Sequence, residues 1–184
     1  MRRSITILCV LFAVALAGCA GRYRADLYAV APQPYQVGSG DRLRIIVYGQ
    51  DGLSNSYSVD SLGQISLPLV GFVPVNGMTV HQVEQTVSAR LRNGYVRDPR
   101  VSCEVEAYRP FFILGEVTTA GQYPFVNGMT VQKAVAIAGG FTPRAYQGAA
   151  TLTRIYNGQQ VVGDVPITAP VQPGDTIVLR ERFF

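Results

Sequence analysis

The sequence predicts an α+β protein in which helices lie on small mixed sheets, and three observations support this class. Residues 42–47 and 101–105 alternate between apolar and polar side chains, as strands with one buried face do. Residues 79–93 carry apolar side chains three and four positions apart, which is typical of an amphipathic helix. The hexapeptide Val-Asn-Gly-Met-Thr-Val occurs at 75–80 and again at 126–131, so two similar strand–turn–helix units follow each other.

The first unit begins with a turn and a strand. The sequence Gly-Ser-Gly-Asp at 38–41 predicts a tight turn. In the strand that follows, Leu43, Ile45 and Val47 point to one face. Shorter strands are expected at 56–60, 64–69 and 70–73.

Residues 79–93 form the clearest predicted helix. Thr79 can cap its N-terminus, and Gln82 completes a capping box because its side chain can reach back to the backbone of the cap. Gly94 ends the helix, where a left-handed residue is commonest. The apolar stripe consists of Val80, Val83, Val87 and Leu91.

A strand at 101–105 is predicted to place Cys103 in the core, as a structural thiol and not a reactive one. The second unit continues with strands at 111–114 and near 121–124, and a helix from Thr130 that stops at Gly139 and Gly140. Strands near 150–156 and 176–179 complete it, the last one following a Pro-Gly-Asp turn that contains Gly174 and Asp175.

Composition limits the function classes. The chain has 184 residues, of which 48% are hydrophobic and 15% charged, and this excludes an intrinsically disordered protein. The single histidine, His81, excludes a metal site that needs two imidazoles. It is expected to be a solvated residue, since no recognisable motif supplies it with a nucleophile and an orienting carboxylate. We therefore expect no metal, no cofactor and no catalytic residue.

The N-terminus is typical of an exported protein. Two arginines precede an uncharged apolar run at 5–17, which is too short to span a membrane as a mature helix. The sequence Leu-Ala-Gly-Cys at 16–19 resembles the lipobox of bacterial lipoproteins. That resemblance implies cleavage between Gly18 and Cys19 and lipid attachment to the Cys19 thiol. The alternative is an ordinary signal peptide with an incidental cysteine.

Removal of a signal peptide at 1–18 changes the length and the net charge of the chain. It leaves 166 residues and lowers the formal net charge from +4 to +2, so the basic pI does not indicate nucleic-acid binding. Cys103 then has no cysteine partner within the chain, because Cys19 carries the lipid. Residues 19–34 are expected to be a tether. Ala20 is not the aspartate that commonly retains such lipoproteins at the inner membrane, which favours the outer membrane.

An ordered series of motifs resembles the bacterial polysaccharide biosynthesis/export family. In a first domain, expected at 35–107, the series opens at 35–43 with Tyr-Gln-Val-Gly-Ser-Gly-Asp-Arg-Leu and continues with Leu-Pro-Leu-Val-Gly at 67–71. A second domain, expected at 108–184, resembles the soluble-ligand-binding β-grasp (SLBB) module that follows in that family. The motifs that carry this second part lie at 112–117, 121–123, 138–141, 171–175 and 180–184.

The resemblance implies an envelope lipoprotein that exports capsular polysaccharide or exopolysaccharide. In well-known members, protomers form a periplasmic ring, and a C-terminal helix from each crosses the outer membrane. This sequence stops at Phe184, directly after the β-grasp module, so a ring-forming homo-oligomer that relies on a separate outer-membrane protein is expected. The other implied partners are the polysaccharide, the inner-membrane polymerisation and co-polymerase machinery, and the membrane through the acyl chains. Nucleic acid is not among them.

The motifs are interpreted as structural. The turn with Gly38, Gly40 and Asp41 lacks the full glycine pattern of a phosphate loop, and in this family its aspartate is expected to organise the turn through backbone hydrogen bonds. Glu104 and Glu106 share a strand face at about 7 Å. Carboxylates at such a separation can cleave glycosidic bonds. An exposed pair of this kind is nevertheless more often a solvated edge or an oligomer contact. Asp41 and Asp60 are further candidates for such a carboxylate pair, and for them too the structural explanation is preferred.

Four arginines cluster at the end of the first helix and just beyond it. Cations there complement the negative end of the helix dipole, which is the structural explanation. The functional alternatives are a salt-bridged interface between protomers and contact with an acidic polysaccharide. The cluster consists of Arg90, Arg92, Arg97 and Arg100.

The leading interpretation is a lipid-anchored, non-enzymatic export component that oligomerises. It would lie at the outer membrane and face the periplasm. The first alternative is an envelope lipoprotein that binds a glycan or a protein without transporting anything. The second is an enzyme such as a polysaccharide hydrolase.

Overall fold

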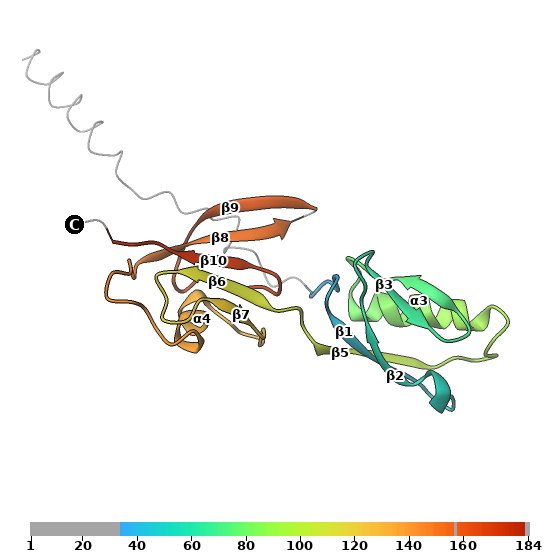
Figure 1. Ribbon diagram of the computed structural model, residues 1–184. Helices are drawn as coiled ribbons and strands as arrows, with labels where there is room; N and C mark the ends of the chain where they lie inside the picture. The colour runs from blue at the N-terminus through green and yellow to red at the C-terminus, as the bar shows by residue number, and fades with distance from the viewer. Residues whose placement is uncertain (1–33, 157, 183–184) are drawn as a thin grey trace, which may run out of the picture.

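The computed structural model describes residues 34–156 and 158–182. They form two lobes joined by a short extended connection, with the N-terminal module in one lobe and the C-terminal module in the other (Figure 1). Each lobe combines one α-helix with β-sheet, so the predicted α+β class is confirmed. Gly18, Cys19 and the rest of the predicted signal and tether up to residue 33 lie outside the described residues.

The first module contains a three-stranded sheet and a hairpin. The sheet has the antiparallel order β2-β1-β5, with β1 at Arg42–Val47, β2 at Asn55–Ser58 and β5 at Val101–Ala107. The hairpin pairs β3 (Gln64–Leu67) with β4 (Gly71–Pro74). A short 3₁₀ turn, η1 (Asp51–Leu53), which the sequence analysis did not predict, connects β1 to β2.

Helix α3 (Val80–Arg92) lies where the sequence predicts it. Its capping box is complete, because Thr79 Oγ1 accepts from the Gln82 backbone N–H (3.3 Å) and Gln82 Oε1 accepts from the Thr79 N–H (2.8 Å). Gly94 has φ +99° and ends the helix as expected. Three of the four predicted stripe residues, Val83, Val87 and Leu91, are fully buried, whereas Val80 is partly buried.

Sheet, hairpin and helix share one core. Leu43, Ile45 and Val47 enter it from β1, and β3, β4 and α3 contribute further buried side chains. Full burial of each such side chain contributes about 1.5–3 kcal/mol. Cys103 is buried in the same core, as predicted, and its backbone N–H on the edge strand β5 donates to Glu84 Oε1 at 2.9 Å. Glu84 thereby ties α3 to the exposed edge of the sheet.

The second module contains a five-stranded mixed sheet of order β7-β6-β10-β8-β9 with helix α4 (Val131–Ile137) on one face (Figure 1). Only β6 and β10 pair in parallel, and all other neighbours are antiparallel. The strands are β6 (Phe111–Gly115), β7 (Gly121–Tyr123), β8 (Ala149–Tyr156), β9 (Gln159–Pro166) and β10 (Thr176–Leu179). The sequence analysis missed β9, because Gly163 and Asp164 interrupt its apolar alternation.

The core of the second module lies between α4 and the sheet. Val131, Ala134 and Val135 of the helix are buried against Ile113 of β6 and Ile177 of β10, among others. Thr130 caps α4 by accepting from the Lys133 backbone N–H. The predicted stop at two consecutive glycines is confirmed, since both have positive φ values of +84° and +92°.

The two modules repeat one structural unit in opposite chain order. In the first module, Val37 leads through a Gly-Asp turn into β1, and its N–H donates to the carbonyl of Met78 in the repeated hexapeptide (2.9 Å). In the second, Val171 leads through a Gly-Asp turn into β10, and its N–H donates to the carbonyl of Met129 (3.0 Å). The turn and strand therefore precede the hexapeptide and helix in one module and follow them in the other.

Candidate functional site

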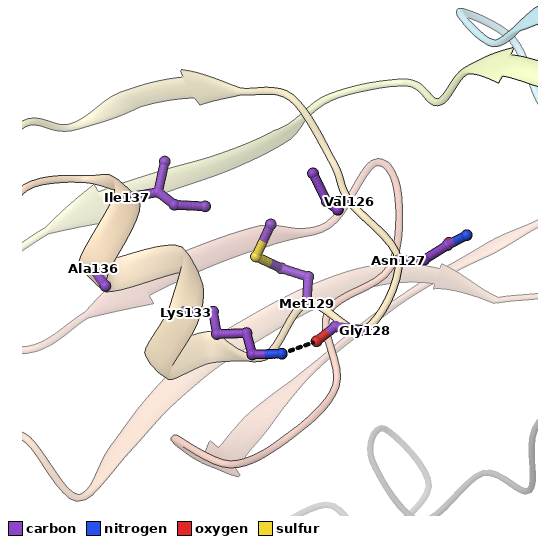
Figure 2. A pocket seen from close by; sticks show the side chains of 7 residues that line it. All are labelled: Val126, Asn127, Gly128, Met129, Lys133, Ala136 and Ile137. Carbon is purple, nitrogen blue, oxygen red and sulfur yellow. Dashed lines mark hydrogen bonds between the residues drawn. The ribbon is translucent and has the colours of Figure 1, made fainter.

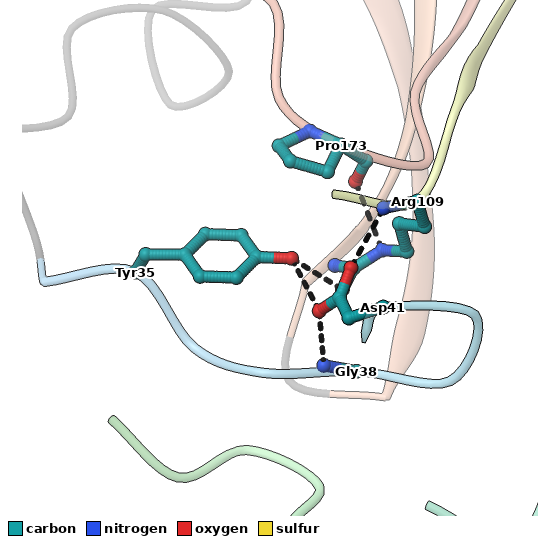
Figure 3. Close-up of polar contacts among 5 residues, drawn as sticks. All are labelled: Tyr35, Gly38, Asp41, Arg109 and Pro173. Atoms are coloured by element: carbon teal, nitrogen blue, oxygen red, sulfur yellow. Dashed lines mark hydrogen bonds and ion pairs between the residues drawn. The ribbon is translucent and has the colours of Figure 1, made fainter. Parts of the chain in front are cut away.

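The turn before β1 is organised by a wholly buried carboxylate, Asp41 (Figure 3). Its Oδ2 accepts from the Gly38 N–H at 2.8 Å and from the Tyr35 hydroxyl at 2.6 Å. Its Oδ1 accepts from the backbone N–H of Arg109 at 2.7 Å. The positive φ of Gly40, +90°, lets the chain close this turn without strain.

Arg109 lies in the connection between β5 and β6 and links the two modules. Its Nη1 donates to the Tyr35 hydroxyl (3.0 Å) and forms an ion pair with Asp41 Oδ2 (3.2 Å). Its Nε donates to the carbonyl of Pro173, in the turn before β10, at 3.1 Å. Figure 3 shows the guanidinium between Asp41 and Pro173, so one side chain joins the corresponding turns of both modules.

Close packing and burial fix this junction. A Cβ atom at Gly38 or Gly174 would fall within 3.0 Å of the Arg109 side chain, so the two glycines leave the space that the arginine occupies. Burial, with the hydrogen bond to Asp41 as the second cause, raises the pKa of the Tyr35 hydroxyl. The hydroxyl therefore stays protonated and serves as a donor to Asp41.

The turn before β10 is also organised by a buried carboxylate, and the side-chain partner of this carboxylate belongs to the same module. Asp175 is buried, and its Oδ2 accepts from the Gln172 N–H at 2.7 Å, as Asp41 Oδ2 accepts from Gly38. Arg154 of β8 donates to both carboxylate oxygens, from Nε at 2.9 Å and from Nη2 at 2.7 Å. This bidentate pair neutralises the buried charge within the second module.

The four clustered arginines do not converge on a common partner. Arg90 Nη1 donates to the Phe72 carbonyl at 3.0 Å, and the exposed Arg100 lies 3.9 Å from Asp98. Arg92 and Arg97 form no ion pair with another described residue. All four belong to the end of α3 or to the loop that follows it. This end of α3 points away from the second module (Figure 1).

The remaining polar candidates lie in the first module, and two of them, Glu104 and Glu106, are both exposed on β5. His81 is exposed, and its ring contacts the side chains of Glu84 and Gln85 on its own helix. Glu106 lies on an exposed strand face, 3.8 Å from Arg42. Burial raises the pKa of Cys103 to about 12, with the nearby glutamates as the second cause, which makes its thiol a poor nucleophile.

An open pocket lies beside α4, in the second copy of the repeated unit (Figure 2). Its volume is about 390 Å³. Figure 2 shows Val126, Met129 and Ile137 facing one another across it, with the Lys133 amine at one side and Asn127 directed away. Lys133 Nζ donates to the Gly128 carbonyl at 2.7 Å. The sequence analysis did not predict this pocket.

Two structural features do not occur among the described residues. No group of three or more histidine, cysteine, aspartate or glutamate side chains that could hold a metal ion occurs at 34–156 or 158–182. Within the same ranges, no helix has both the length and the apolar character needed to cross a membrane.

Each of the two lobes matches a known protein family. Residues 29–106 match the family described as polysaccharide biosynthesis/export protein, and residues 110–165 match the SLBB domain. The chain belongs to the polysaccharide biosynthesis/export family. In this export-family chain, Asp41 and its turn lie in the first matched stretch, whereas Arg109 lies between the two stretches.

Curated relatives of the export-family chain carry consistent names. Exopolysaccharide production protein ExoF of Rhizobium meliloti (strain 1021) is 33% identical over 171 residues, which span 86% of this chain and 36% of ExoF. EPS I polysaccharide export outer membrane protein EpsA of Ralstonia nicotianae is 31% identical over 133 residues, which span 58% of this chain and 35% of EpsA. The chain thus spans about a third of the length of the curated relatives it matches.

The sequence analysis did not single out Tyr35, Arg109 or Arg154 as functional residues. Arg109 lies 68 residues from Asp41 and 64 from Pro173, so no local pattern connects them. The one local signal is its position between two predicted strands, where an export-family chain passes from the first module to the second. Arg154 lies within a strand whose other inward residues are apolar, and a buried charge at such a position indicates a buried partner.

Proposed function

We propose that this chain is a non-enzymatic, lipid-anchored component of the machinery that exports capsular polysaccharide or exopolysaccharide. The observation that carries the proposal is the match of both modules, in order, to the export family and the SLBB domain. The names of two relatives, an exopolysaccharide production protein and a polysaccharide export outer membrane protein, support it. The lipobox-like sequence that ends at Cys19 supports lipid attachment, and Ala20 after it favours the outer membrane, on its periplasmic side.

The chain works as a homo-oligomer in this proposal. The two modules are too small to enclose a channel wide enough for a hydrated polysaccharide, so several copies surround the path in this proposal. Head-to-tail contacts close into a ring only when every copy presents its two contact surfaces at the same angle. The hydrogen bonds of Arg109 to Asp41 and Pro173 hold the modules in one arrangement and so favour this condition.

The partners follow from this role. The chain receives polysaccharide from inner-membrane polymerisation and co-polymerase machinery and passes it towards the outer membrane. The four arginines from Arg90 to Arg100 are available for contacts between protomers or with an acidic glycan. Exposed arginines form both kinds of contact readily.

A deletion strain tests the proposal. We expect loss of extracellular and surface polysaccharide, and its recovery when the wild-type chain is supplied on a plasmid. Polysaccharide retained inside the cell envelope would place the defect at export. Unchanged extracellular polysaccharide in the deletion strain would contradict the proposal.

A second candidate function is ligand binding without transport, and the pocket beside α4 favours it. A volume of about 390 Å³ lies within the range of small-molecule sites, roughly 300–1,000 Å³. A deletion strain that exports normally, together with glycan binding by a protein that remains monomeric, would favour this alternative.

A further inference from the structure

The pocket beside α4 lies in one copy of a duplicated unit, so the other copy serves as an internal reference. The two hexapeptides are offset by 51 residues, and the same offset relates the first turns of α3 and α4. It places Val75 opposite Val126, Gln82 opposite Lys133, Gln85 opposite Ala136 and Thr86 opposite Ile137.

The two copies present different surfaces at these equivalent positions. Val75 is fully buried in the first module, whereas Val126 is 61% exposed in the second. Gln85 and Thr86 give the first copy a polar helix face, on which Thr86 Oγ1 donates to the Gln82 carbonyl at 2.8 Å. The second copy carries Ala136 and Ile137 there, and Ile137 is 48% exposed.

The repeated unit therefore does not require an apolar surface at this place. The first copy forms the same threonine cap and helix start although it carries Gln85 and Thr86 at the surface positions in question. Val126, Ala136 and Ile137 are exposed beside the buried Met129 and leave apolar area in contact with water, outside the core of the second module. Such a cluster in a concave pocket is typical of a binding surface.

The charge of the pocket indicates the class of ligand. Lys133 is the single lysine of the 184-residue chain, and no acidic residue lines the pocket with it. Its ammonium group has three donors, and the Gly128 carbonyl, at 2.7 Å, accepts one of them. The remaining donors and the uncompensated positive charge suit a carboxylate that sits beside an apolar group.

We propose that this pocket binds a carboxylated sugar unit of the exported glycan, with the carboxylate on Lys133 and an apolar C–H face of the sugar on Val126, Met129 and Ile137. The inference rests on the proposed function for the source of the ligand. It adds a site, a ligand chemistry and a preference for acidic over neutral glycans.

The direct test is binding of tetragalacturonate to the purified full chain, measured by calorimetry at low salt. Its methyl ester is the matched probe, because esterification removes the negative charge and keeps the sugar rings. We expect tetragalacturonate to bind at least tenfold more tightly than the ester, and the difference to shrink as salt screens the charge. Equal binding of the two probes, or no binding of tetragalacturonate, would overturn the proposal.

Two variants locate the site. Lys133→Gln places the first module's residue at this position and should weaken tetragalacturonate binding at least tenfold. The double variant Ala136→Gln with Ile137→Thr copies the polar face of the first module, which the repeated unit already tolerates, and should weaken binding of both probes. Gln85→Ala, at the equivalent exposed place in the first module, is the control and should leave binding unchanged.

Two results with these variants would overturn the proposal. Unchanged affinity in Lys133→Gln would overturn the proposal, and so would a double variant that changes the oligomeric mass while glycan binding stays intact. The latter result would assign the pocket to a contact between copies. Failure of this site is distinguishable from failure of the proposed function, because the deletion strain reports export independently of tetragalacturonate binding.

Discussion

The backbone N–H of Arg109 donates to the Oδ1 atom of Asp41 at 2.7 Å, across 68 residues of chain. The same arginine forms an ion pair with Oδ2 of that carboxylate through its side chain, and its Nε reaches Pro173 in the second module. Asp41 therefore organises its own turn and also fixes the point at which the chain leaves the first module. This buried charge therefore contributes to the arrangement of the two modules, beside the ring contacts of Tyr108 with Tyr35 and Phe125.

Asp41→Ala should destabilise the first module strongly. It leaves the Gly38 and Arg109 N–H groups and the Tyr35 hydroxyl without their acceptor in a buried place. Loss of one partner from a buried, hydrogen-bonded charge pair costs about 3–5 kcal/mol. The free energy of unfolding in urea measures the effect.

Asp60→Ala is the matched control for that variant. The Asp60 carboxylate also accepts from two turn N–H groups, those of Leu62 and Gln64, but it forms no inter-module link. Its loss should cost about 1 kcal/mol. Equal destabilisation by the two variants would contradict the special role of Asp41.

Arg109→Ala should uncouple the two modules. The variant removes the hydrogen bonds to Tyr35 and Pro173 and leaves the Asp41 charge without its guanidinium partner. We expect calorimetric unfolding to separate into two transitions and the radius of gyration from small-angle X-ray scattering to increase. Arg92→Ala is the control, since Arg92 lies on the exposed end of α3. One unchanged transition in Arg109→Ala would show that the modules are held together by other contacts.

The raised pKa of Cys103 predicts that the folded chain loses stability at alkaline pH. Burial raises its pKa to about 12 in the folded chain from an ordinary value of 9.0, so above pH 9 the unfolded state releases a proton that the folded state keeps. The folded state then binds more protons, and stability falls as the pH rises, by about 1.5 kcal/mol between pH 9 and pH 10.5. Unfolding of wild type and Cys103→Ala over this range isolates the contribution. Parallel pH profiles would contradict it.

Cys19→Ala should release the protein from membranes. The lipobox interpretation makes this thiol the lipid attachment site, and two or three acyl chains anchor a protein far more firmly than one. Fractionation of cell envelopes, followed by immunoblotting, measures the change, and polysaccharide export should fall in the same strain. Ala20→Gly, which keeps the cysteine, is the control. An unchanged membrane fraction in Cys19→Ala would show that the anchor lies elsewhere.

Local patterns in the sequence were sufficient for the helices and most strands. The cap and apolar stripe of α3 are local features, and the hexapeptide repeat indicates the second helix start directly. Strand β9 escaped prediction because Gly163 and Asp164 break its alternation, although its pairing with β8 extends over eight residue pairs. Tertiary pairing overrides weak strand propensity at such positions.

The candidate sites depended on long-range contacts and were less predictable. The Gly-Asp turns are visible in the sequence, but the partners of their carboxylates, Arg109 and Arg154, come from other strands or connections. The pocket could not be predicted from the hexapeptides, because the two copies are identical in sequence. The difference lies in their surroundings, which bury Val75 and expose Val126.

The mass of the detergent-extracted, acylated protein, measured by native mass spectrometry, tests most directly the claim that this chain acts as an assembled export component. The account predicts a discrete large oligomer with a single number of protomers, which Arg109→Ala should disperse. A monomer at working concentration, unchanged by the addition of envelope extract, would contradict it.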